Sequence, residues 1–157
     1  MRTGLGFDIH RFEEGKILVL AGIQIPYHCG LKGHSDGDVV LHSISDAISG
    51  ALGIEDIGTR FPDTDMSLKG IKSSKILESY RDSLISVDAR IYNLDIVIIA
   101  EKPKLQPWYG AMKKSIAQIL GVNVSCVGVK AKTMEGLGEI GKGKAIACFA
   151  SILIDIP

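Results

Sequence analysis

Residues 145–154 read AIACFASILI, the longest apolar run in the chain, and this stretch decides the fold. Its length suits a β-strand and falls short of the roughly 20 residues that a membrane-spanning helix needs. A second apolar run, Ile96-Val97-Ile98-Ile99, lies in a strand expected at residues 89–100. Because these two strands are apolar on both of their faces, both faces of the sheet must be covered.

Patterns on either side of these runs supply the other elements. Alternating apolar residues predict strands, and apolar residues three or four positions apart predict helices. Further strands are expected at Leu5–Phe12, at Ile17–Ile25 with a break near Gly22, and at Val124–Lys132. Helices are expected from Ser35 to Gly53, Ser74 to Ile85 and Trp108 to Gly121, with loops at Cys29–His34, Ile54–Lys72 and Thr133–Gly143.

These elements predict an α/β (α+β) fold, a two-layer sandwich in which about three helices cover one face of a mixed sheet. A doubly wound sheet, covered on both faces, would need more helices than the sequence supplies. We therefore expect a homo-oligomer whose subunits bury the other sheet face at its centre. No repeat or linker interrupts the chain, so residues 1–157 are expected to form a single domain.

Charge and cysteine content narrow the class of protein. The 18 basic and 18 acidic residues balance, whereas broad nucleic-acid binding needs a cationic surplus. The three cysteines lack Cys-x-x-Cys spacing, which is typical of buried thiols rather than of a disulfide framework. No signal peptide is expected from the mixed polar and apolar N-terminus, so we expect a cytoplasmic protein without nucleic-acid or membrane partners. A plastid location would require a transit peptide that had been removed.

The first helix is expected to open with Ser35-Asp36-Gly37-Asp38. Ser35 can cap free backbone N–H groups, and Asp38 three residues later completes a capping-box pattern. Free N–H groups and the helix dipole would favour an anion beside His34 and Ser35.

Two short motifs carry metal-ligand chemistry. Asp8 and His10 stand two positions apart on a predicted strand, so their side chains point to the same face. Asp38, His42 and Asp46 are spaced by four, which places them on one helix face. Each motif taken alone is also typical of polar side chains on a solvent-exposed strand or helix face.

Combined, Asp8, His10 and His42 form a ligand set of two imidazoles and one carboxylate. This set suits zinc and leaves a fourth coordination position open, although manganese or another divalent ion would accept it. The neighbouring acids Asp38 and Asp46 would orient an imidazole or contact substrate. His28 has no partner at ligand spacing, and we interpret it as structural.

Four motifs, in order along the chain, resemble those of the 2-C-methyl-D-erythritol 2,4-cyclodiphosphate synthase family. They are Gly6-Phe7-Asp8-Ile9-His10, Gly33-His34-Ser35-Asp36-Gly37-Asp38, Asp56-Ile57-Gly58 and Phe61-Pro62-Asp63-Thr64-Asp65. The resemblance continues through Pro103-Lys104, Lys130-Ala131, Thr133 and Glu135, and it covers essentially the whole chain.

The resemblance implies a phosphorus–oxygen lyase of the non-mevalonate route to isoprenoids. Such an enzyme converts 4-diphosphocytidyl-2-C-methyl-D-erythritol 2-phosphate to the 2,4-cyclodiphosphate and releases CMP. It is a homotrimer with active sites between adjacent subunits, which agrees with the oligomer expected from the uncovered sheet face.

The resemblance also assigns residues. Zinc would be held by Asp8, His10 and His42, and a second cation, Mg²⁺ or Mn²⁺, by Glu135, while His34 and Thr133 match positions that stabilise the transition state. The implied substrate-binding residues are Asp8, Ile9, His10, His34, Ser35, Asp46, Asp56, Ile57, Gly58, Phe61, Pro62, Asp63, Thr64, Asp65, Ala100, Glu101, Lys102, Pro103, Lys104, Leu105, Gln106, Ala131, Lys132, Thr133, Met134, Glu135, Glu139 and Lys142.

The sequence departs from the family pattern in two places. Lys132 and Met134 interrupt a run of hydroxyl residues that many members have before Glu135. Glu139 and Lys142 stand where an aromatic residue and an arginine often line the trimer axis and bind an isoprenoid diphosphate. Glu139 would repel such an anion.

Two other functions are compatible with parts of the sequence. A zinc-dependent phosphohydrolase would use the open zinc position to activate water, with Asp46 as a base, but it leaves the Pro103-Lys104 match unexplained. A non-catalytic trimeric binding module would be expected to lose site residues, whereas all the metal ligands are present.

Overall fold

The computed structural model describes all residues from 1 to 157. Its main sheet has five strands. The strands stand in the order β4 (Cys29–Leu31), β1 (Arg2–Glu14), β7 (Ala145–Asp155), β5 (Arg90–Ile99) and β6 (Val127–Lys132). All neighbours are antiparallel except β5 and β6, which are parallel, so the sheet is mixed. A separate hairpin pairs β2 (Leu18–Leu20) with β3 (Ile23–Ile25).

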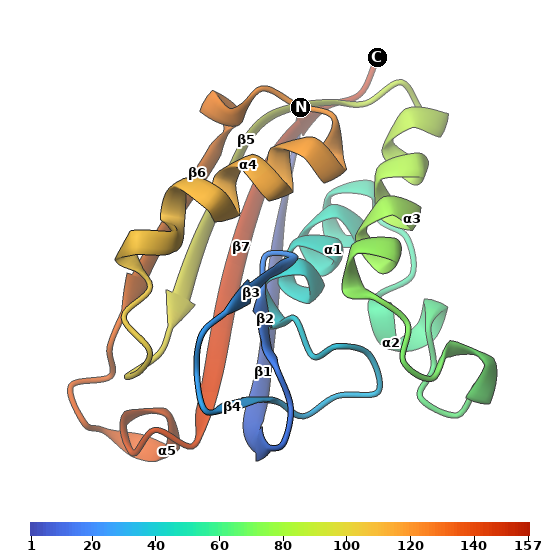
Figure 1. Ribbon diagram of the computed structural model, residues 1–157. Helices are drawn as coiled ribbons and strands as arrows, with labels where there is room; N and C mark the ends of the chain where they lie inside the picture. Colours follow the sequence, from blue (N-terminus) through green and yellow to red (C-terminus); the bar gives the residue numbers. More distant parts are fainter.

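Three long helices form the second layer. They are α1 (Val39–Leu52), α3 (Ser73–Ser86) and α4 (Tyr109–Leu120). All three lie on the same side of the sheet, and both chain ends lie at one end of the molecule (Figure 1). Short helices α2 (Ile57–Arg60) and α5 (Gly138–Gly141) and the 3₁₀ turns η1 (Met66–Leu68), η2 (Gln106–Trp108) and η3 (Val124–Cys126) join these elements. The predicted two-layer α/β architecture is confirmed.

Two glycines allow helix α1 to lie directly on strand β1. A Cβ atom built on Gly4 would stand 1.9 Å from the carbonyl oxygen of Ala47, and one on Gly6 would stand 1.9 Å from that of Ser43. No side chain fits such a gap, so only glycine permits this approach. The close packing brings His42 of α1 next to the strand that carries Asp8.

Strand β1 presents its two faces to different surroundings. Gly4 and Gly6 are buried under α1, whereas Leu5, Phe7 and Ile9 point to the other face and are 69%, 48% and 48% exposed. Phe149 of β7 pairs with Phe7 on that outer face, and their ring centroids are 4.7 Å apart. The chain by itself therefore leaves apolar side chains on the outer face of its sheet, as the sequence predicted.

Among the predicted elements that the structure corrects, two lie around helix α1 and strand β1. Helix α1 begins at Val39, four residues after the predicted Ser35, because Gly37 has a φ of 74° and breaks the helical path. The predicted loop at Cys29–His34 contains β4, whose residues pair with the end of β1. Local pattern could not reveal this strand because it is only three residues long and its partners on β1 lie 15 to 19 positions earlier (Glu14 with Cys29, Phe12 with Leu31), far beyond a two-residue hairpin.

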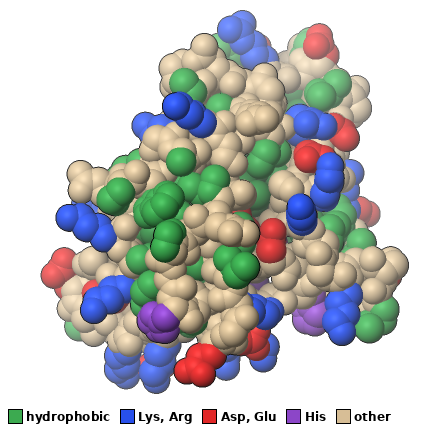
Figure 2. Space-filling view, viewed as in Figure 1, with side chains coloured by type: hydrophobic (Ala, Val, Ile, Leu, Met, Phe, Trp, Pro, Cys, Tyr) green, Lys and Arg blue, Asp and Glu red, His purple; other side chains and the backbone are tan.

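All three cysteines are free, and two of them, Cys29 and Cys148, are buried. None of the helices combines the length and the apolar character needed to cross a membrane. On the helix-bearing side, Lys and Arg side chains alternate with Asp and Glu side chains around the molecule, without a surface of one sign (Figure 2).

Candidate active site

Asp8, His10 and His42 bring three donor atoms together. The Oδ2 atom of Asp8 lies 2.8 Å from Nε2 of His10 and 3.0 Å from Nδ1 of His42. The two histidine nitrogens are 3.2 Å apart. Tetrahedral zinc with bonds of about 2.0 Å separates its ligand atoms by about 3.3 Å. The set therefore fits a metal ion of this kind, and the predicted ligand cluster is present.

Neighbouring atoms fix the directions of two of these ligands. Asp8 accepts the backbone N–H of Ile9 on Oδ1 at 2.8 Å, which turns Oδ2 toward the histidines. His10 Nδ1 lies 2.5 Å from the carbonyl oxygen of Lys32. Because a carbonyl only accepts, Nδ1 carries the hydrogen and the lone pair of Nε2 is available to a metal.

The charges of the cluster depend on one another. Burial acts to raise the pKa of Asp8, but hydrogen bonds from His10 and His42 outweigh it and hold the pKa well below its ordinary value. Burial acts to lower the pKa of His10, but the hydrogen bond and the charge of Asp8 outweigh it and raise the pKa. In the metal-free protein the cluster thus favours an ion pair that a metal cation would replace.

The donor atoms open into a hollow of about 560 Å³. Its walls come from β1, from the segment before α1, and from the region that runs from α2 into α3. The predicted residues that line it are Asp8, His10, His34, Ser35, His42, Asp46, Ile57, Gly58, Phe61, Pro62, Asp63 and Asp65. Sequence reasoning missed other lining residues, among them Lys69 and the apolar side chains of Met66, Leu68 and Ile71.

Segment 61–71 is held against the rest of this hollow by two contacts. Nδ1 of His34 lies 3.1 Å from Oδ1 of Asp63. The backbone N–H of Gly70 donates to the carbonyl oxygen of His34 at 2.7 Å. His34 therefore stands between the metal ligands and this segment, with its side chain 65% exposed.

Asp38 and Asp46 do not hydrogen-bond to the imidazole of His42, so the structure contradicts one of their two predicted roles, that of orienting an imidazole. Contact with the substrate, the other role, stays a prediction. Asp38 is fully buried and accepts the backbone N–H groups of Ala21 and Gly22 as well as those of Val40 and Leu41. Asp46 accepts the backbone N–H of Ile57 at 3.0 Å and lines the hollow. Spacing of four placed these acids on the helix but could not show which neighbours they meet.

The helix N–H groups that the predicted anion site would use are already paired, so an anion beside His34 and Ser35 stays a prediction that the start of α1 does not support. The N–H groups of Val40 and Leu41 are those that an anion would have to reach, and the Asp38 carboxylate already accepts them. This carboxylate sits where an external anion would have to lie, and its own negative charge would repel one.

The imidazole of His42 has a different set of polar neighbours. Its Nε2 atom lies 2.9 Å from Oγ of Ser73 and 3.1 Å from Oγ of Ser35. Ser73 in turn donates its hydroxyl hydrogen to Asp36. Ser73 and Asp36 were not predicted as site residues, and Ser73 gave no sequence signal because it begins a helix far from the metal motifs.

The predicted cytosine segment lines a second, separate hollow of about 500 Å³. Its lining residues include Ala100, Glu101, Pro103, Lys104, Leu105, Gln106, Ala131, Lys132 and Thr133, together with Tyr109, which was not predicted. Tyr109 accepts the backbone N–H of Ala131 on its hydroxyl at 2.6 Å. Within one chain, this hollow and the metal ligands do not form a joint pocket.

Glu101 ties this segment to the loop of Glu135. Its Oε1 atom accepts the backbone N–H groups of Met134 at 2.7 Å and of Gly136 at 3.3 Å. Between them Glu135 has a φ of 51°, and its carboxylate accepts the hydroxyl of Thr133 at 3.0 Å. Thr133 and Glu135 are thus positioned together at the end of β6.

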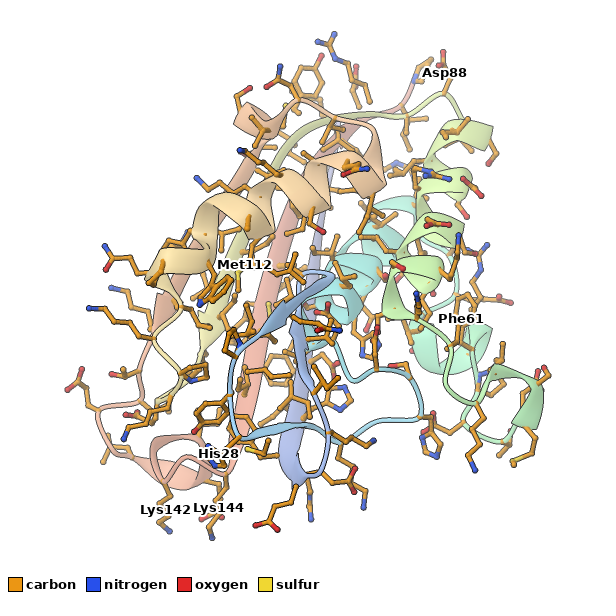
Figure 3. All side chains as sticks on the ribbon, in the orientation of Figure 1. His28, Phe61, Asp88, Met112, Lys142 and Lys144 are labelled. Carbon is orange, nitrogen blue, oxygen red and sulfur yellow. The ribbon has the colours of Figure 1, made fainter.

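Glu139 and Lys142 lie away from both of these hollows. Glu139 forms ion pairs with Lys142 at 3.0 Å and Lys144 at 2.8 Å. Hydrogen bonds from Lys144 and Lys142 lower the pKa of Glu139 to about 2. Figure 3 shows both lysines at the end of the molecule nearest His28, with Phe61 on the opposite flank. Within this cluster of one acid and two lysines, the charge of Glu139 is neutralised by its two ion pairs.

Comparisons with known proteins give the family of the chain. Residues 1–155 match the YgbB family. A 2-C-methyl-D-erythritol 2,4-cyclodiphosphate synthase of Treponema denticola is 48% identical over 98% of this chain and 96% of its own length. The solved complex of Plasmodium falciparum IspF with CDP has a TM-score of 0.86 and 41% identity, over 99% of this chain and 96% of that one.

A two-function relative shows the same domain within a longer protein. The bifunctional IspDF of Campylobacter jejuni matches 99% of this chain with a TM-score of 0.95 and 42% identity. The present chain spans 42% of that protein. With identities above 40% over nearly its whole length, the chain belongs to the YgbB family, together with the 2-C-methyl-D-erythritol 2,4-cyclodiphosphate synthases.

Proposed function

We propose that this chain converts 4-diphosphocytidyl-2-C-methyl-D-erythritol 2-phosphate to 2-C-methyl-D-erythritol 2,4-cyclodiphosphate and releases CMP, as a phosphorus–oxygen lyase of the cytoplasm. The observation that carries the proposal is the convergence of Asp8, His10 and His42 at the edge of a hollow lined by the family motifs. The relatives named as this synthase, and the relative solved with CDP, support it.

The donor set supports zinc at Asp8, His10 and His42, and the carboxylate of Glu135 suits a second ion, Mg²⁺ or Mn²⁺. When bound, such cations supply positive charge that orients and neutralises phosphate groups. Glu135 is exposed at the end of β6, where an oxygen ligand can reach a diphosphate.

The reaction needs no nucleophile from the protein. An oxygen of the substrate's 2-phosphate bonds to the diphosphate phosphorus nearer the erythritol, and the bond from that phosphorus to the oxygen of CMP breaks. The protein's contribution is to position these groups and to stabilise charge. His34 and Thr133 would donate hydrogen bonds to the phosphoryl oxygens that gain charge.

We further propose that three chains assemble around the outer sheet face and share their sites. Leu5, Phe7, Ile9 and Phe149 are large apolar side chains that the single chain leaves exposed on that face. Contiguous exposed apolar surface of this kind marks a protein interface. The cytosine segment and the metal ligands occupy separate hollows in one chain. A complete site would therefore combine the metal hollow of one subunit with the second hollow of its neighbour.

The test is to incubate the zinc-loaded protein with the diphosphocytidyl substrate and Mg²⁺ and to follow phosphorus NMR. The cyclic diphosphate and CMP should appear in equal amounts. Release of inorganic phosphate without the cyclic product would contradict the proposal and favour a hydrolase.

A further inference from the structure

The side of His42 that faces away from the metal ligands is buried against serine hydroxyls. Its Nδ1 atom belongs to the donor cluster with Asp8 and His10, so any metal must bind through Nδ1. Its Nε2 atom points instead to Ser73 Oγ at 2.9 Å. Ser73 is fully buried at the first residue of α3. No other element offers Nε2 a partner besides Ser35.

The hydrogen of the Ser73 hydroxyl is already committed. Ser73 donates it to Oδ1 of Asp36, and that carboxylate can only accept. Asp36 also accepts the backbone N–H of Ser73 at 3.3 Å, which holds the two residues together. Toward His42, therefore, the Ser73 oxygen can offer only a lone pair.

This direction of donation makes Ser73 an acceptor for a hydrogen on Nε2 of His42. A metal on Nδ1 uses the lone pair of that nitrogen, so the hydrogen of the neutral imidazole stands on Nε2. Ser73 Oγ, 2.9 Å away, then accepts it in a hydrogen bond. Ser35 completes the arrangement: it accepts the N–H of Gly37 at 3.1 Å and lies 3.2 Å from Ser73 Oγ, to which it can donate.

We propose that Ser73 and Asp36 are positioning residues that hold His42 in the Nε2–H tautomer and thereby present Nδ1 to the metal. Hydrogen bonds to the outer nitrogen of a ligand histidine generally fix its tautomer and raise its basicity. Here the carboxylate acts through a serine, and the relay runs from Asp36 to Ser73 to His42. This inference rests on the metal-binding part of the proposed function.

The experiment compares Ser73→Ala with Ser45→Ala. Both serines are fully buried, but Ser45 donates to the carbonyl oxygen of Leu41 at 2.9 Å and is not hydrogen-bonded to a metal ligand. Zinc affinity is measured by competition with a chromophoric chelator. Ser73→Ala should bind zinc about 10–100-fold more weakly than the unmodified protein, and Ser45→Ala should bind it equally well. Equal affinity of all three proteins would overturn the proposal.

A spectroscopic measurement separates positioning from folding. In ¹H–¹⁵N spectra of the zinc-loaded protein, the hydrogen on Nε2 of His42 should give a resolved signal, because Ser73 holds it in a hydrogen bond. In zinc-loaded Ser73→Ala this hydrogen should exchange with water faster. An equal exchange rate in the two proteins would contradict the relay. If Ser73→Ala fails to fold, Asp36→Asn replaces it, and an unchanged zinc affinity and exchange rate in Asp36→Asn would overturn the proposal.

Neither measurement uses the substrate. A protein that binds zinc with the expected tautomer but forms no cyclic diphosphate would therefore refute the proposed reaction and support the relay. If Ser73→Ala instead makes the product with unchanged rate and zinc affinity, the result would support the proposed reaction and refute the relay.

Discussion

The Nδ1 atom of His42 lies 3.0 Å from the Oδ2 atom of Asp8, although 34 positions separate the two residues. Asp8 belongs to β1 and His42 to α1, so this contact exists only because the helix lies against the strand. It places a carboxylate oxygen and an imidazole nitrogen at the separation expected of two ligands of one ion.

Replacing His42 by alanine removes one of three donors, so zinc affinity should fall by more than the about 100-fold that loss of an outer partner can cost. Isothermal titration with zinc measures the affinity and the stoichiometry. His28→Ala is the matched control, because this substitution also removes an imidazole but at a position outside the donor cluster. Unchanged binding in His42→Ala would rule out this histidine as a ligand.

The metal-free cluster should stabilise the fold within a defined pH window. Asp8 has a lowered pKa, so its contribution is present above its ordinary value of 3.8 and is lost as the pH falls through the lowered pKa. His10 has a raised pKa, so its contribution is present below its ordinary value of 6.5 and is lost as the pH rises through the raised pKa. The stabilising contributions of Asp8 and His10 are therefore both present between pH 3.8 and pH 6.5.

Asp8→Asn tests this window. In chelator-treated protein, the free energy of unfolding that Asp8→Asn costs should be larger at a pH inside the window than at mildly alkaline pH, by about 1 kcal/mol or less. Urea unfolding at fixed protein concentration measures it. A cost that does not change with pH would show that Asp8 and His10 do not form the inferred ion pair.

Gly6→Ala should push α1 away from β1. The added Cβ atom would stand 1.9 Å from the carbonyl oxygen of Ser43 and 2.6 Å from the nitrogen of Ala47, both of them backbone atoms. Overpacking of this kind costs about 3 kcal/mol or more, and the displacement should also weaken zinc binding. Urea unfolding and zinc titration measure the two effects.

Gly50→Ala is the control for that substitution. Gly50 lies in the same helix, and its Cβ atom would have no neighbour closer than 3.9 Å. Because alanine favours a helix more than glycine does, Gly50→Ala should be neutral or stabilise by up to about 1 kcal/mol. If both variants unfold alike, the close approach of helix and strand does not exist.

Phe149→Lys should dissociate the proposed trimer. Phe149 packs on Phe7 on the outer sheet face, and burying a charge there without a partner is unfavourable. Sedimentation equilibrium should give three times the chain mass of 16.9 kDa for the unmodified protein and a lower mass for the variant. Ile85→Lys, at a 66% exposed apolar residue of α3, should remain a trimer. A monomeric unmodified protein would refute the assembly.

The local patterns of the sequence predicted much of the fold. Helices α3 and α4 and strands β5 and β7 lie within one or two residues of their predicted bounds, because each has a clear periodicity and an end signal such as Gly121. The predicted start of α1 was wrong, since the capping pattern at Ser35 competes with Asp38, whose side chain is also held by two distant N–H groups.

Local order along the chain already selects which side chains β1 offers to the site. Alternation along β1 turned Asp8 and His10 to one face and Phe7 and Ile9 to the other, since strand geometry depends only on neighbours in the chain. The tertiary structure alone decided that His42 joins them, that Asp38 is a buried cap, and that Ser73 and Asp36 stand behind His42. These contacts link distant segments, and no local pattern encodes them. The contact of His42 with Asp8 follows from the approach of α1 to β1 over Gly4 and Gly6, and the other contacts follow from the packing of the β2–β3 turn and α3 against the start of α1.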